Sequence, residues 1–403
     1  MGDLLMSRQH YKVYSEGRIG NLVMKNRLVR SATGESQMST DGKISQSVLQ
    51  VYKDLALGGV GTIVTGAMAA TPTAKRTEGQ YCIYDDDFIP EVAKIAHTVH
   101  ETDPECIVIA QLNHPGRQVH HYVTADCIAP SAVESPILIK KARELQPDEI
   151  GQIIQYFANA IIRVQKAGFD GVQFHAAHGY LLSSFLSPYT NRRTDRYGGS
   201  VQKRANIIRD IVALAREEVG DFPILIKLNC DDHVEGGINK DNFPELLDEI
   251  ATTGVDAIEV SGGMWDCLVR TEDELGFTPV PIPEARTKIG ALAKQSYYYD
   301  YIKDIRLSIP LILVGGHRNI ERMEEIAQNG NADFLSLCRP LISEPDLPNR
   351  WLHGEGLTRA DCISCNACLL VLRKEFCCPY KKYGKLKELY LATNAENWRE
   401  TFK

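Results

Sequence analysis

The sequence lacks any uninterrupted apolar run of about eighteen residues, so we expect no membrane-spanning helix. Its first residues, MGDLLMSRQHYKVYSEG, contain no apolar core followed by a cleavage site, and we expect no signal peptide. An excess of positive charge is also missing, because the formal net charge is -7 at pH 7. This balance argues against nucleic acid or an acidic membrane as the main partner. Together these absences favour a cytoplasmic protein that acts on small molecules.

Other signatures are missing as well. The sequence shows no repeat, no low-complexity run, and no GxGxxG motif after its first predicted strand, which argues against an open dinucleotide-binding sheet. Eleven cysteines in such a chain indicate a reducing compartment rather than a disulfide scaffold. With 44% hydrophobic and 24% charged residues, the composition is that of an ordinary globular protein.

Apolar runs alternate with amphipathic stretches eight times, which predicts repeated strand–helix units. Eight units fit a closed (β/α)8 TIM barrel better than an open sheet. The pattern breaks near Arg350, so we expect a barrel over 1–350 and a Cys-rich extension over 351–403 that packs on it. The predicted strands are 27–32, 62–66, 106–112, 171–175, 224–229, 257–261, 311–315 and 334–337, and the helical patterns include 45–57, 89–100, 148–167, 202–219, 243–253 and 320–328.

Two connections, 113–146 and 262–296, are long. Strand-to-helix loops of a barrel lie at its catalytic end, so we expect both to form walls of a pocket.

The stretch VQFHAAHGYLLSSFLSPYTNRRTDRYGGS, residues 172–200, carries the most chemistry. A short apolar run ends here on His175, His178 and Tyr180, which predicts hydrogen-bond and proton donors at the end of one strand. The alternative is that these side chains only satisfy backbone groups in the core.

This stretch resembles the fourth-strand segment of the Old Yellow Enzyme family, FMN-dependent ene-reductases on a (β/α)8 barrel. It is also similar to the reductase part of 2,4-dienoyl-CoA reductases. The resemblance implies bound FMN, with NADH or NADPH as the electron donor and an enone or enoate as the substrate. The run 129–132, APSA, resembles the family segment near the substrate rim.

Two polar side chains in otherwise apolar strands suit a flavin ring. Burying Lys227 is costly unless a negative group meets it, and the flavin N1/O2 edge would do so. The alternative is a buried carboxylate partner. The amide of Gln111 can donate and accept at once, as the pyrimidine edge requires.

The ends of the last two strands are expected to bind the FMN phosphate. Gly315 and Gly316 allow close backbone approach, and Cys338 and Arg339 follow the final strand. The alternative is two tight turns and a surface arginine. By resemblance, the remaining flavin contacts are Ser31, Ala32, Thr33 and Gly66, with Gln111 and Lys227 at the ring edge.

The resemblance also assigns roles in catalysis. His175 and His178 would polarise the substrate carbonyl, and Tyr180 would give a proton to the α-carbon. Amine dehydrogenases of the family typically carry Tyr in place of His175, so an amine dehydrogenase or demethylase is the second interpretation. Dienoyl-CoA reductases have a second acid, a His, shortly after the sixth strand, and the corresponding segment here, 263–266 (GMWD), contains no His, which favours a simple enone or enoate.

The extension has the pattern Cys362, Cys365, Cys368, followed by Cys377 and Cys378. CxxCxxC with a later cysteine is typical of a [4Fe–4S] site. We do not favour a cluster or any other metal, because the fourth cysteine comes early and no electron-transfer domain follows. A barrel subunit of a larger Fe–S flavoprotein reductase, a flavin-free barrel, and a homo-oligomer all remain open.

Overall fold

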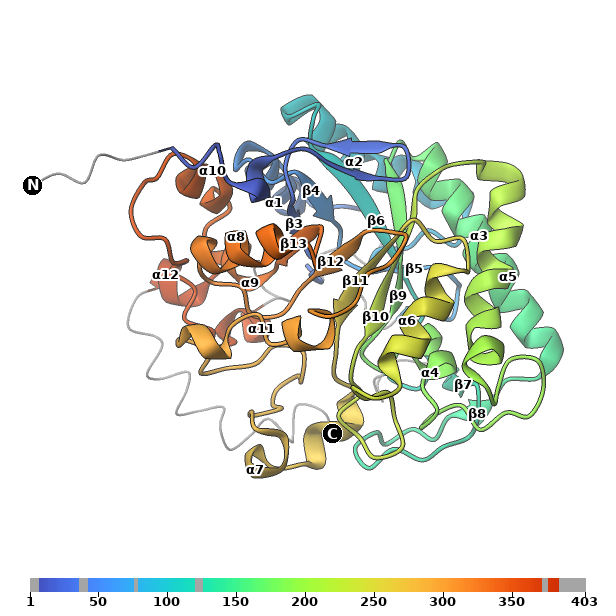
Figure 1. Ribbon diagram of the computed structural model, residues 1–403. Helices are drawn as coiled ribbons and strands as arrows, with labels where there is room; N and C mark the ends of the chain where they lie inside the picture. The colour runs from blue at the N-terminus through green and yellow to red at the C-terminus, as the bar shows by residue number, and fades with distance from the viewer. Residues whose placement is uncertain (1–6, 36–42, 76–78, 120–125, 372–375, 384–403) are drawn as a thin grey trace, which may run out of the picture.

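The computed structural model describes residues 7–35, 43–75, 79–119, 126–371 and 376–383. Within these ranges, eight parallel strands form a barrel in the order β4-β3-β13-β12-β11-β10-β9-β6, which a β4–β6 pairing closes (Figure 1). The predicted (β/α)8 fold is confirmed. The barrel strands are β3 (Leu28–Arg30), β4 (Thr62–Val64), β6 (Ile107–Asn113), β9 (Gly171–Ala176), β10 (Ile224–Asn229), β11 (Ala257–Ser261), β12 (Leu311–Leu313) and β13 (Phe334–Leu337).

Six long helices surround the barrel, each close to its predicted range. They are α1 (Gln46–Leu57), α2 (Ile89–Thr102), α3 (Pro147–Lys166), α5 (Val201–Val219), α6 (Phe243–Ala251) and α8 (Ile320–Asn329). The shorter elements include α4 (Leu181–Leu186), α7 (Glu272–Leu275), α9 (Arg339–Ser343), α10 (Leu347–Leu352), α11 (Ala367–Val371), α12 (Pro379–Tyr383), β5 (Met68–Ala69), β7 (Ile128–Ala129) and β8 (Arg143–Glu144). In Figure 1 the loops that carry α7 and the β7–β8 pair lie at the same end of the barrel.

The sixth unit departs from the repeated pattern. Between β11 and β12 the chain forms only α7 and short 3-10 turns, two of which are Trp265–Val269 and Tyr299–Tyr301. Buried aromatic packing replaces the missing helix: the rings of Tyr297 and Tyr298 meet edge to face at 4.7 Å. This long segment therefore folds against the barrel mouth instead of along its side.

The barrel interior has two layers, because alternate residues of a strand point inward. The layer nearer the amino ends is apolar and comprises Val29, Val64, Ile109, Leu225, Ala257, Ile312 and Phe334. Two residues further along five of these strands stand polar side chains, and a sixth comes from β9. We call this set the polar layer: Ser31, Gln111, Gln173, Lys227, Glu259 and Ser336, all buried.

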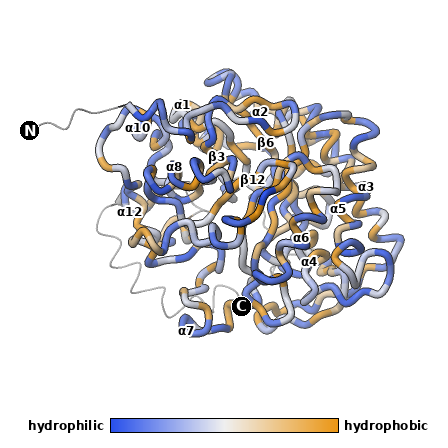
Figure 2. Tube along the Cα trace, viewed as in Figure 1, coloured by the Kyte–Doolittle hydropathy of each residue, from blue (hydrophilic) through white to orange (hydrophobic). Residues whose placement is uncertain are grey.

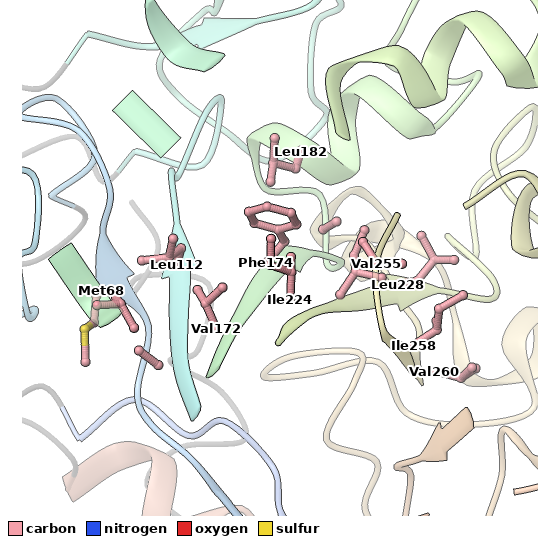
Figure 3. Packing of buried hydrophobic residues seen from close by; sticks show 14 of the residues in the cluster. Met68, Leu112, Val172, Phe174, Leu182, Ile224, Leu228, Val255, Ile258 and Val260 are labelled. Atoms are coloured by element: carbon pink, nitrogen blue, oxygen red, sulfur yellow. The ribbon is translucent and has the colours of Figure 1, made fainter. Parts of the chain in front are cut away.

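The outward faces of the strands pack against the helices. Val172 and Phe174 of β9 point away from the polar layer, and Figure 3 shows Leu182 of α4 next to the Phe174 ring. The Phe174 ring meets Phe157 of α3 edge to face at 6.1 Å. Figure 2 shows the same division, with apolar colour along the strands and hydrophilic colour on the outer turns of the helices. Both faces of β9 are therefore buried, which fixes its register.

A hairpin closes the amino end of the barrel. Strands β1 (Gly17–Ile19) and β2 (Leu22–Met24) pair antiparallel, and Ile19 and Met24 pack in one cluster with the apolar layer. Val23, which directly precedes Met24 in β2, is 40% exposed. The hairpin thus supplies the side chains that fill the barrel where its own strands end.

Removing the Met24 side chain tests this closure. We expect Met24→Ala to lower the free energy of unfolding by about 2–5 kcal/mol, because it deletes a fully buried side chain from the barrel core. The neighbouring control, Val23→Ala, should change it by less than about 0.5 kcal/mol. Denaturant unfolding of the two variants measures both values, and equal losses would contradict this role of the hairpin.

Candidate active site

The end of β9 brings together the three side chains that the sequence singles out. The ring centroids of His175 and His178 are 5.1 Å apart, and those of His175 and Tyr180 are 4.5 Å apart. His178 has a φ of 62°, so the chain turns sharply after the strand and returns the second imidazole beside the first. Each of the three is 6–7% exposed. Two imidazoles and a phenol therefore form one compact group.

The surroundings of His178 fix its ring and its charge. Its Nε2 lies 2.8 Å from the Ser261 hydroxyl at the end of β11, and its backbone N–H donates to Asn229 Oδ1 at 3.0 Å. Burial, and secondarily the positive charge of Lys227, hold the pKa of His178 well below its usual value. The imidazole is therefore neutral near pH 7, with one N–H to donate.

Lys227 lies in the polar layer directly beside this group, since it is the register partner of His175. Its Nζ donates to Ser31 Oγ at 2.7 Å and lies 3.3 Å from Glu259 Oε2. A buried carboxylate partner for Lys227, the alternative that the sequence left open, is thus present. The two contacts use two of the three ammonium donors, so the pairing does not saturate Lys227.

Gln111 belongs to the same polar layer and is connected to Glu259 through Gln173. Its Nε2 donates to Gln173 Oε1 at 2.8 Å, and Gln173 Nε2 donates to Glu259 Oε2 at 2.9 Å. Ser31 and Ser336 each donate to Glu259 Oε1 at 2.8 Å. One carboxylate therefore accepts from four neighbouring side chains.

The predicted phosphate end contains more positive charge than expected. The Arg339 guanidinium is buried and donates to Arg286 O at 3.0 Å and to Asn366 Oδ1. Nearby, Arg318 is 3% exposed, and its Nη2 has no hydrogen-bond partner among the described residues. Burial, opposed by the nearby Cys362 and reinforced by Arg339, lowers the pKa of Arg318. A buried, incompletely paired cation at the ends of β12 and β13 suits a phosphate.

Gly315 and Gly316 have positive φ angles of 121° and 80°. A Cβ on Gly315 would lie 2.6 Å from the Tyr298 ring, and one on Gly316 would lie 2.5 Å from the Tyr297 ring. Glycine is required at both positions because of the positive φ angles and because a side chain would collide with the tyrosine rings. These reasons are separate from the close approach to a phosphate that the sequence suggests.

The first two barrel strands bring the remaining predicted contacts to the same end. Thr33 Oγ1 donates to Ser31 O at 3.0 Å and lies 3.1 Å from Cys338 Sγ. Ala32 lies between them and is partly buried. Gly66 is pressed against Glu35, whose Oε2 would lie 2.1 Å from an added Cβ. The predicted positions therefore lie around one barrel mouth, and their roles toward a flavin remain predictions.

The described part of the extension packs on this mouth. The backbone N–H of Ala360 donates to Arg318 O at 2.8 Å, and Asn366 Nδ2 donates to Ala285 O at 2.6 Å. Residues 372–375 and 384–403 lie outside the described part of the chain. The division near residue 350 stays a prediction.

The cysteines of the extension are free thiols. Burial raises the pKa of Cys368 to about 12, with Cys338 nearby acting in the same direction. Within the described ranges, no group of three or more His, Cys, Asp or Glu side chains is arranged to hold a metal ion.

Three contributors escaped the sequence analysis: Gln173, Glu259 and Arg318. Glu259 was visible as a lone acid in the apolar run 257–261, and Gln173 as a lone amide before His175. Only the register of neighbouring strands shows that they meet Lys227 and Gln111.

Comparison with known proteins places the chain in a family. The model of the NADH:flavin oxidoreductase / NADH oxidase family matches residues 17–357. An NADH oxidase from Thermoanaerobacter brockii is 34% identical over 358 residues, which make up 88% of this chain and 52% of that protein. The NADH-dependent flavin oxidoreductase iliE from Hypocrea jecorina is 32% identical over 373 residues, 84% of this chain and 88% of that protein. The chain thus spans about half the length of the first relative and most of the second.

A solved structure of 2-naphthoyl-CoA reductase in complex with 2-naphthoyl-CoA has a TM-score of 0.80 and 24% identity, over 94% of this chain and 58% of that one. This likeness supports the fold. The chain belongs to the NADH:flavin oxidoreductase / NADH oxidase family, and the resemblance to Old Yellow Enzymes is confirmed. The cofactor of this family is FMN. The partly unpaired Lys227 and Arg318 fit its ring edge and its phosphate. Among the described residues, no helix is long and apolar enough to cross a membrane.

The neutral state of His178 predicts a pH dependence. Because its folded pKa lies below the unfolded value of about 6.5, the unfolded chain binds the extra proton and stability falls as the pH falls through that value. We expect His178→Asn to remove about 1 kcal/mol of the stability lost between pH 7.5 and 5.5. Denaturant unfolding at the two pH values measures this difference. His97→Asn, at an exposed histidine, is the control and should leave the loss unchanged, and an unchanged loss in His178→Asn would contradict the neutral imidazole.

Proposed function

We propose that the chain is an FMN-dependent ene-reductase, which uses NADH or NADPH to reduce the C=C bond of an α,β-unsaturated carbonyl compound, an enone or enoate. The observation that carries the proposal is the group of His175, His178 and Tyr180 packed beside Lys227 at the barrel mouth. Bound FMN would supply the hydride chemistry that links the nicotinamide and the alkene.

The protein side chains have separate tasks in this proposal. His175 and His178 donate N–H groups to the substrate carbonyl oxygen, where negative charge builds as the alkene is reduced. Ala177 N–H donates to His175 Nδ1 at 3.4 Å, which favours the proton on Nε2. A neutral His178 donates without a charge of its own, so its imidazole acts as a preorganised dipole.

Tyr180 completes the reaction as the proton donor to the α-carbon. It is 7% exposed and contacts the His175 ring edge to face. The Tyr180 ring therefore belongs to the same group as the carbonyl donors, as simultaneous contact with one small substrate requires.

Asp266 bears on the choice of substrate. Its Oδ2 accepts from Arg117 Nη2 and Tyr189 OH, both at 3.0 Å, and its Oδ1 accepts from Ser135 Oγ at 2.9 Å. These contacts hold the Asp266 side chain in place, and the segment 263–266 offers no His as a second acid. This supports a simple enone or enoate over a conjugated dienoyl-CoA.

Anaerobic two-step kinetics tests the proposal. Protein reconstituted with FMN should be bleached by NADH or NADPH and then reoxidised by members of a panel of cyclic enones and enoates, with the saturated product formed. Colourless protein after reconstitution would indicate a flavin-free barrel isomerase or lyase. Reduction by a methylated amine without enone turnover would indicate an amine dehydrogenase or demethylase.

A barrel subunit of a larger Fe–S flavoprotein is the second candidate, because the chain covers 52% of the Thermoanaerobacter NADH oxidase. It requires an electron-transfer partner. Co-purification with a flavodoxin-like protein, together with iron and sulfide in anaerobically prepared material, would favour it over a self-sufficient reductase.

Tyr180→Phe separates the two half-reactions. We expect alkene reduction to slow by about 10²–10⁴-fold, because the general acid is lost, while flavin reduction by the nicotinamide persists. Stopped-flow absorbance measures both rates. Tyr197→Phe is the matched control, since the Tyr197 hydroxyl donates to Asp210 instead, at 2.8 Å. Equal losses in both half-reactions would contradict the role of Tyr180.

A further inference from the structure

We infer that Glu259 is a positioning residue: it orients Lys227 and Gln111, the two side chains that we expect at the flavin ring edge. We also infer that its negative charge lowers the flavin reduction potential. Glu259 is not among the flavin contacts predicted from the sequence. The inference rests on the proposed function, because it requires bound FMN. It goes further in assigning the setting of the potential to a carboxylate that contacts Lys227 and Gln173.

The Glu259 carboxylate carries a negative charge and has all its hydrogen-bond positions filled. Glu259 is fully buried in the middle of β11. Burial opposes its ionisation, but the Lys227 charge and three donated hydrogen bonds outweigh burial and hold the pKa of Glu259 below its usual value. An ionised carboxylate only accepts hydrogen bonds, and here each oxygen meets two donors. All four acceptor positions are filled.

The Glu259 carboxylate determines how the side-chain amides of Gln173 and Gln111 are oriented. Because Glu259 can only accept, Gln173 must turn its NH2 toward it, at 2.9 Å. The Gln173 oxygen then faces Gln111 and accepts from Gln111 Nε2 at 2.8 Å. Gln111 Oε1 has no hydrogen-bond partner among the described residues, so it is left as an acceptor. The N3–H group of a flavin pyrimidine is the donor that this acceptor suits.

The Glu259 carboxylate also acts on the charge beside the ring. Lys227 Nζ is 3.3 Å from Glu259 Oε2, so the ammonium is held in place and its charge is partly offset. A cation at the N1/O2 edge favours the electron-rich reduced flavin. The Glu259 charge, close behind that cation, opposes this effect. Its removal should therefore make reduction easier.

Glu259→Gln tests the inference, because it removes the charge and keeps the shape. In FMN-reconstituted protein, we expect the ratio of reduced-flavin to oxidised-flavin affinity to rise about tenfold, which equals a shift of about 30 mV to more positive two-electron potential. Glu259→Asp keeps the charge and should move the potential less. A potential that is unchanged or more negative in Glu259→Gln would overturn the inference.

Two further variants separate position from general damage. In a Lys227→Met background, Glu259→Gln should shift the potential much less, because a buried Glu259 without the ammonium takes up a proton and has no charge left to remove. Asp256→Asn is a structural control near the start of the same strand, where the carboxylate pairs with Arg216 at 2.7 Å. It should lower stability without moving the potential. A shift of the same size in either variant would contradict the inference.

Gln173→Leu tests the amide relay and keeps both members of the ion pair, and it remains informative if Glu259→Gln does not fold. We expect the dissociation constant for FMN to rise about tenfold, since Gln111 loses its fixed orientation. Unchanged FMN affinity would refute the relay. Wild-type protein that binds no FMN would refute the proposed function itself, whereas flavin-loaded wild type with unaffected variants would refute only this inference.

Discussion

A single buried carboxylate organises the inside of the barrel mouth. Glu259 accepts from side chains of β3, β9, β10 and β13, and through Gln173 it reaches β6. Removing one partner from such a saturated network leaves a buried charge uncompensated, which is costly. The polar layer is therefore a rigid platform, and the groups with capacity left over, on Lys227 and Gln111, face the end where His175 and Tyr180 gather.

The rest of the structure supports this platform. The hairpin and the apolar layer fill the barrel on the amino-terminal side of the polar layer. Close packing there prevents the polar side chains from changing position. The long segment after β11 lies over the mouth, where its tyrosines press on Gly315 and Gly316 and its carbonyl at Arg286 accepts from Arg339. Loops that carry the chemistry thus rest on an interior whose hydrogen bonds are nearly complete.

The sequence was sufficient for local features and insufficient for those that depend on register. The eight strands follow from apolar runs and helix stops, and His175, His178 and Tyr180 could be chosen because they are close along the chain. Glu259 could not be assigned to Lys227, because their meeting depends on how β10 and β11 align. The long connection after β11 was predicted, but its packing was not, because its contacts are aromatic and long-range.

The central claim is that the polar layer holds the pyrimidine edge of FMN. A crystal structure of the FMN-reconstituted protein tests it most directly. The account predicts the flavin N1/O2 edge within hydrogen-bond distance of Lys227 Nζ and the ring N3–H on Gln111 Oε1, with both imidazoles facing the same side of the ring. A flavin bound elsewhere, or a barrel mouth that takes up only phosphate, would contradict it.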